Sequence, residues 1–170
     1  MIPTLSTDRL RLRAPVLADL PALIAFFASE QSHTVGGPLD ARGAFRSLNA
    51  TIGHWVTRGF GSWHIADAQN DAYLGRVGFI EAPGWDEPEL GWAVMPVAQG
   101  KGIAYEAALA ARAHGAQHLG LDGTISYIRP SNARSARLAK RLRARIEQSK
   151  PDWLGKPVDI WRHPRIGAPA

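Results

Sequence analysis

The stretch of sequence best suited to chemistry is PVAQGKGIAYEAALAARAHG, residues 96–115. Its first half is rich in glycine and typical of a loop, whereas its second half has the apolar spacing of a helix. The first amides of a helix have no carbonyl partner within it, so they suit an anionic ligand. Gly100 and Gly102 lack a Cβ atom, which lets the backbone approach such a ligand closely. The alternative is an ordinary tight loop before a core helix.

Two common phosphate-binding motifs do not match this loop. A Walker loop has Ser or Thr after its lysine and Gly five residues before it, but Gly102 follows Lys101 and Pro96 holds the earlier place. A dinucleotide-binding fingerprint has a third glycine where Tyr105 stands, within a parallel βαβ unit. The remaining interpretation is a loop whose amides, over residues 99–104, converge on a pyrophosphate.

Other residues exclude or weaken several kinds of site. With no cysteine, the chain forms neither a disulfide nor a thiolate nucleophile. His114 and His118 have the spacing of a zinc-binding helix, but Gly115 replaces the glutamate of that motif, so we expect no metal. A basic run indicates either a solvated helix face or a polyanion site. It comprises Arg134, Arg137, Lys140, Arg141, Arg143 and Arg145.

The composition is that of one folded unit. The chain has 170 residues, 45% hydrophobic and 21% charged, so we expect a single domain over residues 1–170. Its net charge of +5 favours a phosphate-bearing ligand or a nucleic acid. No apolar run approaches the roughly 20 residues that cross a bilayer. Residues 1–15 lack the apolar core of a signal peptide, so we expect a cytoplasmic protein without a membrane partner.

Helices and strands must position these residues. Helical apolar spacing is present in four segments: residues 18–29, 40–56, 102–119 and 132–148. Strand patterns occur in TDRLRLRAP (7–15), in residues 61–67, 72–82, 88–95 and 123–128, and in the closing PVDIWR. The three central strands follow one another through short turns and are predicted to pair antiparallel. This order predicts an α+β fold, a mixed α/β sandwich with helices on the faces of one sheet.

Three segments, in order, resemble the GNAT superfamily of acyl-CoA-dependent N-acetyltransferases, in its RimJ/RimL-type branch. Gln99-x-x-Gly102-x-Ala104 is similar to motif A of that family, TDRLRLRAPVLADLPAL to its first strand and helix, and ISYIRPSNARSARLAKRLRA to its motif B. The resemblance implies the GNAT acyl-CoA N-acyltransferase fold, with a mostly antiparallel sheet and about four flanking helices. Its fourth and fifth strands, here residues 88–95 and 123–128, splay apart in a V.

The resemblance also implies where acetyl-CoA, as cosubstrate, would bind. In this family the pantetheine lies in the V beside the fourth strand, and the pyrophosphate lies on motif A. Asn132 and Ser135 match the N-x-x-S of motif B, whose Asn approaches the pantetheine and whose Ser approaches the sulfur. Asn132 has an equal explanation as a helix N-cap. The expected cofactor-binding residues are Ala93, Val94, Met95, Gln99, Gly100, Lys101, Gly102, Ile103, Ala104, Asn132 and Ser135.

Transfer to an amine needs a base that takes its proton. The resemblance implies Glu89 as this base, against the alternative of a surface carboxylate, with Glu81 in reserve. Many relatives have a tyrosine that acts as the general acid at the position where this chain has Ala139. Its absence leaves Ser135 to assist the departing thiolate. Trp85 is expected either at the acceptor entrance or as an exposed loop aromatic.

Relatives usually end the motif B helix with a glycine where this chain has Arg143. Without that glycine, we expect the helix to continue through Arg145 and to change one wall of the acceptor pocket.

The implied function is acetyl-CoA-dependent transfer of an acetyl group to a primary amine, of a small molecule or a protein N-terminus, by direct attack in a ternary complex. The alternative is a non-catalytic acyl-CoA-sensing or RNA-binding module on the same fold, motivated by Ala139 and the basic run. Homodimers occur in this family and are a further expectation for the assembly. The sequence carries no code for the acceptor.

Overall fold

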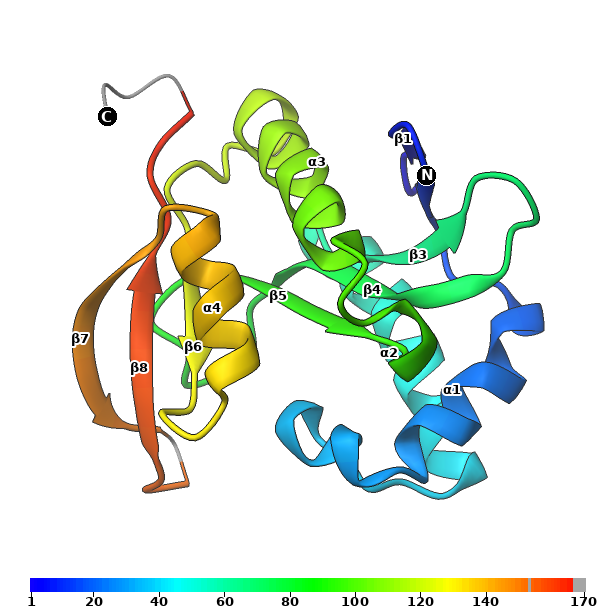
Figure 1. Ribbon diagram of the computed structural model, residues 1–170, viewed down its shortest axis with the longest axis horizontal. Helices are drawn as coiled ribbons and strands as arrows, with labels where there is room; N and C mark the ends of the chain where they lie inside the picture. Colours follow the sequence, from blue (N-terminus) through cyan, green and yellow to red (C-terminus); the bar gives the residue numbers. More distant parts are fainter. Residues whose placement is uncertain (153, 167–170) are drawn as a thin grey trace.

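The computed structural model describes residues 1–152 and 154–166. Its eight strands join one sheet in the order β1-β2-β3-β4-β5-β6-β8-β7 (Figure 1). Neighbouring strands are antiparallel except β5 and β6, which are parallel, so the expected mostly antiparallel α+β sheet is confirmed. The strands are β1 Leu5–Ser6, β2 Leu10–Arg13, β3 Ser62–Asp67, β4 Tyr73–Ile80, β5 Glu89–Val94, β6 Ile125–Ile128, β7 Arg145–Pro151 and β8 Pro157–Arg162.

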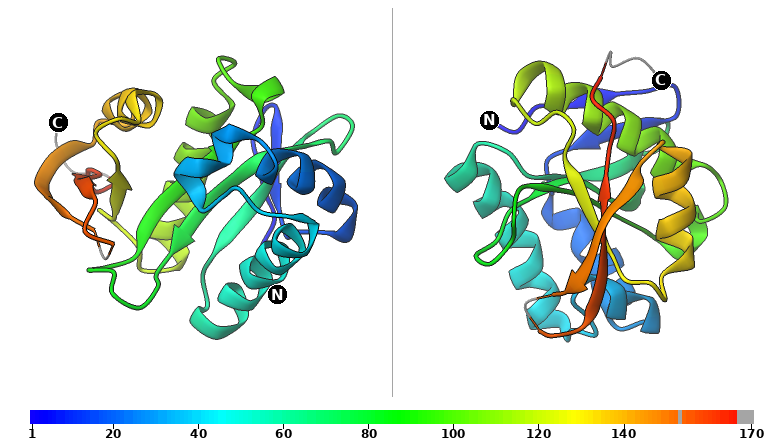
Figure 2. Two further views of the ribbon diagram at one scale, coloured as in Figure 1. Left: turned by 90° about the horizontal axis from the view of Figure 1, so that it is seen from below. Right: turned by 90° about the vertical axis from the view of Figure 1, so that its left-hand side faces the viewer.

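The helices divide between the two faces of the sheet. They are α1 Leu20–Phe27, α2 Ala41–Arg58, α3 Ile103–His118 and α4 Ala133–Arg141, with 3-10 turns at Leu17–Asp19, Glu30–Val35 and Pro96–Ala98. In the right-hand view of Figure 2, α3 lies above the central strands, whereas α1 and α2 lie below them. Among the described residues, no helix has both the length and the apolar character needed to cross a membrane.

The alternation of side chains along β4 and β5 explains this division. Val77, Phe79 and Leu90 are fully buried against the alanine-rich side of α3. The alanines of α3 are small enough to let the helix pack closely on the sheet, and Gly115 is required where it passes Phe79, since a Cβ there would lie 2.4 Å from the ring. The alternate residues of the same strands therefore face α1 and α2.

The prediction of a helix over residues 132–148 was wrong in its second half. α4 ends at Arg141, and Arg143 takes the left-handed conformation, with φ of 63°, that a glycine normally provides. Leu142 and Ala144 on either side are buried, at 2% and 5% exposure, and their burial offsets the strain at Arg143. The chain then enters β7, so the basic run is divided among a helix, a turn and a strand.

Candidate active site

β5 and β6 pair only at their first residues and then diverge along their length (Figure 1). Their register consists of Glu89 opposite Ile125. Beyond this pair, side chains bridge the strands at the narrow end: Ser126 Oγ donates to Leu90 O at 2.6 Å, and the Tyr127 amide donates to Glu89 Oε2 at 2.9 Å. Glu89 therefore lies at the vertex of the predicted V.

The edge of β5 that faces the V carries backbone groups of alternate residues. Leu90 O and Val94 O accept hydrogen bonds from side chains on that side, so the backbone of Trp92 between them also points there. The Met95 amide donates to Leu74 O at 2.8 Å, and Met95 O accepts from the amide three residues later. Of residues 93–95, Val94 is thus the one whose backbone the alternation turns toward the V.

The glycine loop lies at the wide end of the same strand. Gly100 and Gly102 have φ of 73° and 78°, and a Cβ on Gly100 would meet no atom within 4 Å. The first hydrogen bond of α3 runs from the Glu106 amide to Gly102 O, so the amides of residues 103–105 have no acceptor within the helix. This open loop and free helix terminus fit a pyrophosphate.

An ion pair that sequence reasoning missed holds the loop in place. Arg9 forms a salt bridge of 2.6 Å with Glu106 in the first turn of α3, and its Nη1 donates to Lys101 O at 3.1 Å. Thr7 Oγ1 donates to the same glutamate at 2.6 Å. Glu106, which would repel a phosphate, is therefore neutralised, while Lys101 stays exposed. The only signal for Arg9 in the sequence was the alternation of leucine and arginine in TDRLRLRAP, which places the arginines on the solvent-facing side of a strand.

Motif B has its predicted residues at the start of α4, and one of them contacts β5. Asn132 caps α4 by accepting a hydrogen bond from the Ser135 amide at 3.1 Å. Ser135 Oγ lies 3.3 Å from the indole nitrogen of Trp92, which can only donate, so the hydroxyl retains its own hydrogen for another acceptor. Ala139 is fully buried in a cluster with Ile128, so the place of the missing tyrosine is filled by core packing.

The cations of the basic run have separate surroundings. Arg134 donates to Gln99 and so links the start of α4 to the glycine loop. Arg141 stacks 4.0 Å above the ring centroid of Tyr105. Arg145 lies in β7. These contacts break up what the sequence suggested was one continuous cationic face.

Glu89 has the properties of a base at neutral pH. Burial raises the pKa of its carboxyl group to about 7, and the hydrogen bond from the Tyr127 amide and the charge of Arg76 oppose this rise. A carboxylate with such a pKa is ionised in a useful fraction at pH 7 and still accepts a proton from an ammonium group. Glu81, the reserve candidate, is instead paired with Arg58 at 3.1 Å.

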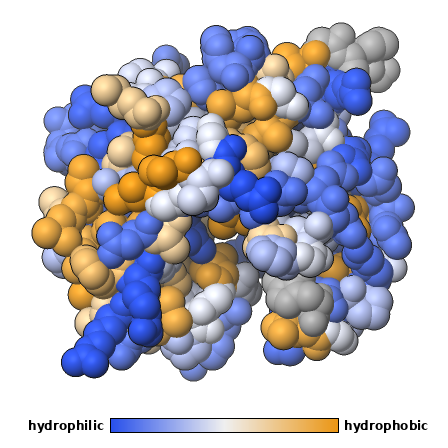
Figure 3. All heavy atoms as spheres, turned by 180° about the vertical axis from the view of Figure 1, so that it is seen from behind, coloured by the Kyte–Doolittle hydropathy of each residue, from blue (hydrophilic) through white to orange (hydrophobic). Residues whose placement is uncertain are grey.

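A cleft of about 240 Å³ opens between α2 and β4, and Figure 3 shows the molecule hollowed near the middle of one face. Its lining includes Ser47, Thr51, His54, Arg76, Glu81 and Trp85. Both residues expected near the acceptor, Glu81 and Trp85, are among them. Ile80 also lines the cleft and lies opposite Glu89 in the β4–β5 register, so the carboxylate is on the same sheet face.

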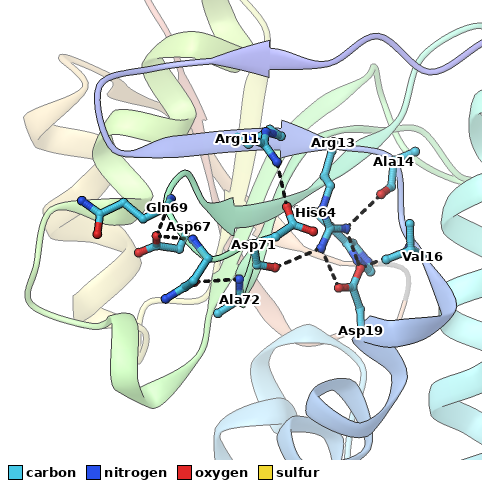
Figure 4. Close-up of polar contacts among 11 residues, drawn as sticks. Arg11, Arg13, Ala14, Val16, Asp19, His64, Asp67, Gln69, Asp71 and Ala72 are labelled. Carbon is cyan, nitrogen blue, oxygen red and sulfur yellow. Dashed lines mark hydrogen bonds and ion pairs between the residues drawn. The ribbon is translucent and has the colours of Figure 1, made fainter.

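The same face carries a compact charged network at the β2 end (Figure 4). Arg13 binds both carboxylate oxygens of Asp19, at 2.8 and 2.9 Å, and Asp71 at 3.1 Å. His64 Nδ1 donates to Asp19 at 2.6 Å. Burial alone would raise the pKa of Asp19, but the hydrogen bonds from Arg13 and His64 hold it below its ordinary value. Burial lowers the pKa of His64, so its imidazole is neutral.

The two histidines on α3 pack against each other and the core. The rings of His114 and His118 are 4.6 Å apart, and His114 meets Trp63 edge-on at 5.6 Å. Within residues 1–152 and 154–166, no three His, Asp or Glu side chains gather as metal ligands.

Comparisons of sequence and structure match this chain to acetyltransferases. A family model described as an acetyltransferase (GNAT) domain matches residues 9–145. An acetyltransferase from Agrobacterium tumefaciens str. C58 is 33% identical, with a TM-score of 0.87 over 96% of this chain and 95% of that one. A protein from Bordetella pertussis named for the same family is 30% identical, with a TM-score of 0.79 over 95% and 99%.

A more distant structure shares the fold alone. It is RimL, a ribosomal L7/L12 alpha-N-protein acetyltransferase solved in complex with coenzyme A, at 17% identity and a TM-score of 0.79 over 96% and 98% of the two chains. The family match spans most of the chain and includes the V, the glycine loop and motif B. The chain therefore belongs to the GNAT family of acetyltransferases.

Proposed function

We propose that this protein transfers the acetyl group of acetyl-CoA directly to a primary amine, with Glu89 as the general base. The observation that carries the proposal is the position of Glu89 at the vertex of the V, with a carboxyl pKa raised by burial to about 7. Its carboxylate also lies on the sheet face that lines the 240 Å³ cleft. A base between the cofactor groove and the acceptor cleft can serve both sides of one transfer.

The free amides of the glycine loop and the open edge of β5 support acetyl-CoA as the cosubstrate. Residues 99–104 and Asn132 would hold its pyrophosphate and pantetheine, and Val94 would pair with it through the backbone. That RimL was solved with coenzyme A supports the same assignment. Acetyl-CoA supplies the activated acetyl group.

In the proposed reaction, Glu89 first takes a proton from the ammonium form of the acceptor. The amine nitrogen then attacks the thioester carbonyl, so a C–N bond forms and the C–S bond breaks. The thiolate leaves, and Ser135 Oγ donates a hydrogen bond to its sulfur. A thiol with a pKa near 8.5 can depart without full protonation, so burial of Ala139 in place of a tyrosine is compatible with turnover.

The acceptor class is a small-molecule amine or a protein N-terminus. The name of RimL refers to the latter, but its low identity carries the fold and not the acceptor.

Calorimetry of acetyl-CoA against two matched glycine variants tests the cosubstrate. Gly102→Glu places a carboxylate at the N-terminus of α3, whereas Gly120→Glu makes the same change at a left-handed glycine just beyond its other end. We expect tight binding by the wild type and by Gly120→Glu, and no detectable binding by Gly102→Glu. Absence of wild-type binding, or equal binding by all three, would contradict the proposal.

A further inference from the structure

Arg76 is a cation without a carboxylate partner on the floor of the acceptor cleft. Its Nη2 donates to Val35 O at 3.4 Å, which is long for a hydrogen bond, and its guanidinium carbon lies 6.0 Å from the Phe27 ring centroid. Among the described residues, no carboxylate forms an ion pair with it. Burial lowers the pKa of Arg76, although a guanidinium remains charged. Most of its five N–H donors are thus available.

The charge of Glu89 raises the pKa of Arg76 from a distance, but the two form no ion pair among the described residues. The other polar groups of the cleft are engaged elsewhere. Glu81 is paired with Arg58 at 3.1 Å. His54 is occupied at both ring nitrogens, because Nδ1 donates to Phe60 O at 2.7 Å and Nε2 accepts from the Glu81 amide at 3.1 Å. The cleft therefore presents a guanidinium without a direct ion-pair partner, which favours an anionic group on the molecule that enters it.

A floor without side chains separates Arg76 from Glu89. On β4, Arg76 and Ile80 are four residues apart, roughly 13 Å at the rise of a strand, and Glu89 is opposite Ile80. Midway between them, Gly78 is paired with Gly91. A Cβ on Gly91 would lie 3.5 Å from Glu89 Oε1, so the carboxylate leans over this floor from its own end.

We propose that Arg76 binds a carboxylate of the acceptor, so that the substrates of this enzyme are amines that also carry a carboxylate. This inference rests on the proposed transferase function. The acceptor amine lies at Glu89 and its carboxylate at Arg76, and the carbon chain between them lies over Gly78 and Gly91, neither of which carries a side chain. Free amino acids have this chemistry, and so does a peptide whose first residues are acidic.

The test is the rate of thiol release from acetyl-CoA with matched acceptors. The panel contains free amino acids, their carboxamides, and peptides with acidic or neutral N-terminal residues. We expect the wild type to prefer each carboxylate over its amide by about tenfold or more in kcat/KM, because a charge-assisted bidentate hydrogen bond is lost in the amide. If the enzyme prefers free amino acids over acidic peptides, its acceptors are free amino acids. The reverse preference identifies a polypeptide as the acceptor.

Three variants locate the preference. Arg76→Gln is expected to reduce the ratio of acid to amide to near one, and Arg76→Lys to retain part of it. Arg46→Gln removes the same charge from an exposed position on α2 and is expected to keep the wild-type ratio. If Arg76→Gln fails to fold, the wild-type ratio and Arg76→Lys still decide the matter.

The failures of the two proposals are distinguishable. Transfer to acids and amides at equal rates, or an unchanged ratio in Arg76→Gln, overturns the role of Arg76 and leaves the transferase in place. If no amine is acetylated, calorimetry of the same amino acids with the coenzyme A complex follows. Binding weakened tenfold by Arg76→Gln then supports the carboxylate site while the transferase fails, and no binding overturns both.

Discussion

Two arginines, Arg13 buried and Arg76 half-buried, lie in one row across the sheet but have opposite surroundings. Arg13 on β2 is opposite His64 on β3, which is opposite Arg76 on β4. Arg13 has a bidentate partner in Asp19, and hydrogen bonds to that carboxylate raise its pKa. Arg76 lacks such a partner, and burial lowers its pKa. Two equal charges lie only two strands apart. The charge of Arg13 is stabilised by its partner, whereas the charge of Arg76 is desolvated without one and lowers the stability of the fold.

The difference separates stability from function. A buried ion pair resists the removal of either partner, because the remaining charge is left unpaired in a poor solvent. Arg13 and Asp19 fix the start of α1 on the sheet in this way. A desolvated cation without an ion-pair partner lowers stability unless a bound ligand supplies the negative charge. Such groups concentrate at functional sites. We therefore expect substitutions near Arg13 to change folding and substitutions near Arg76 and Glu89 to change turnover.

The largest effect is expected from Glu89→Gln. Loss of the base should lower kcat/KM by about a hundredfold to ten-thousandfold. Because the pKa of Glu89 is raised to about 7, the carboxylate is protonated below that pH, so the wild-type rate should rise with pH up to about 7. The variant should lack this limb while remaining folded by circular dichroism. If the limb persists in Glu89→Gln and disappears in Glu81→Gln, the reserve carboxylate is the base.

On the other side of the comparison, Asp19→Ala should destabilise the fold by about 3–5 kcal/mol, since it leaves Arg13 and His64 buried without their shared partner. Asp71→Asn is the matched control, because it removes the charge of a second carboxylate that binds Arg13 and whose own side chain is 47% exposed. Asparagine also tolerates the left-handed φ of 60° at this position. We expect this substitution to change the free energy of unfolding by less than about 1 kcal/mol. Urea denaturation measures both, and equal losses in the two variants would remove the distinction between paired and exposed charge.

The sequence alone predicted the glycine loop and helix α3, because the conformation of each depends on its own residues. Gly100 and Gly102 have positive φ, which the loop demands of its own residues, and the apolar spacing of α3 marks the face that packs on the sheet. Glu89 could be proposed as the base only through the family resemblance. Burial in the folded protein raises its pKa, and the amide of Tyr127, 38 residues later in the chain, opposes that rise.

Arg76 and the end of α4 could not be predicted because tertiary packing decides both. Within AYLGRVGFI, a strand arginine facing a cleft has the same pattern as one facing solvent, and its meaning depends on α2 and Thr51 above it. The turn after α4 forms without glycine because Leu142 and Ala144 become buried. Local propensity gives no information about that burial.

Two histidines are buried in the sheet: His64 lies in the Arg13 network, and His163 lies beside β6, where its Nε2 donates to Ser126 Oγ at 2.9 Å. Burial lowers the pKa of His163 to about 3. As the pH falls below the ordinary value of about 6.5, the unfolded chain takes up this proton first, so stability is lost. The loss reaches about 2 kcal/mol at pH 5.

His163→Gln should therefore flatten the fall in unfolding free energy between pH 7 and pH 5 relative to the wild type. His33→Gln, at an exposed position, should retain the wild-type slope. Comparison of slopes is needed because Glu89, with its raised pKa, contributes with the opposite sign. Parallel curves for all three proteins would show that His163 protonates equally in both states.

The most direct comparison replaces each arginine by methionine, and the smallest effect is expected at Arg76. Arg13→Met should destabilise the protein by several kcal/mol, because Asp19 is left charged and buried at 3% exposure. Arg76→Met should change the free energy of unfolding by no more than about 1 kcal/mol, or raise it, because it removes a desolvated charge that has no carboxylate to lose. A loss in Arg76→Met as large as that in Arg13→Met would mean that Arg76 supports the fold, and its place in the cleft would then no longer indicate an anionic acceptor.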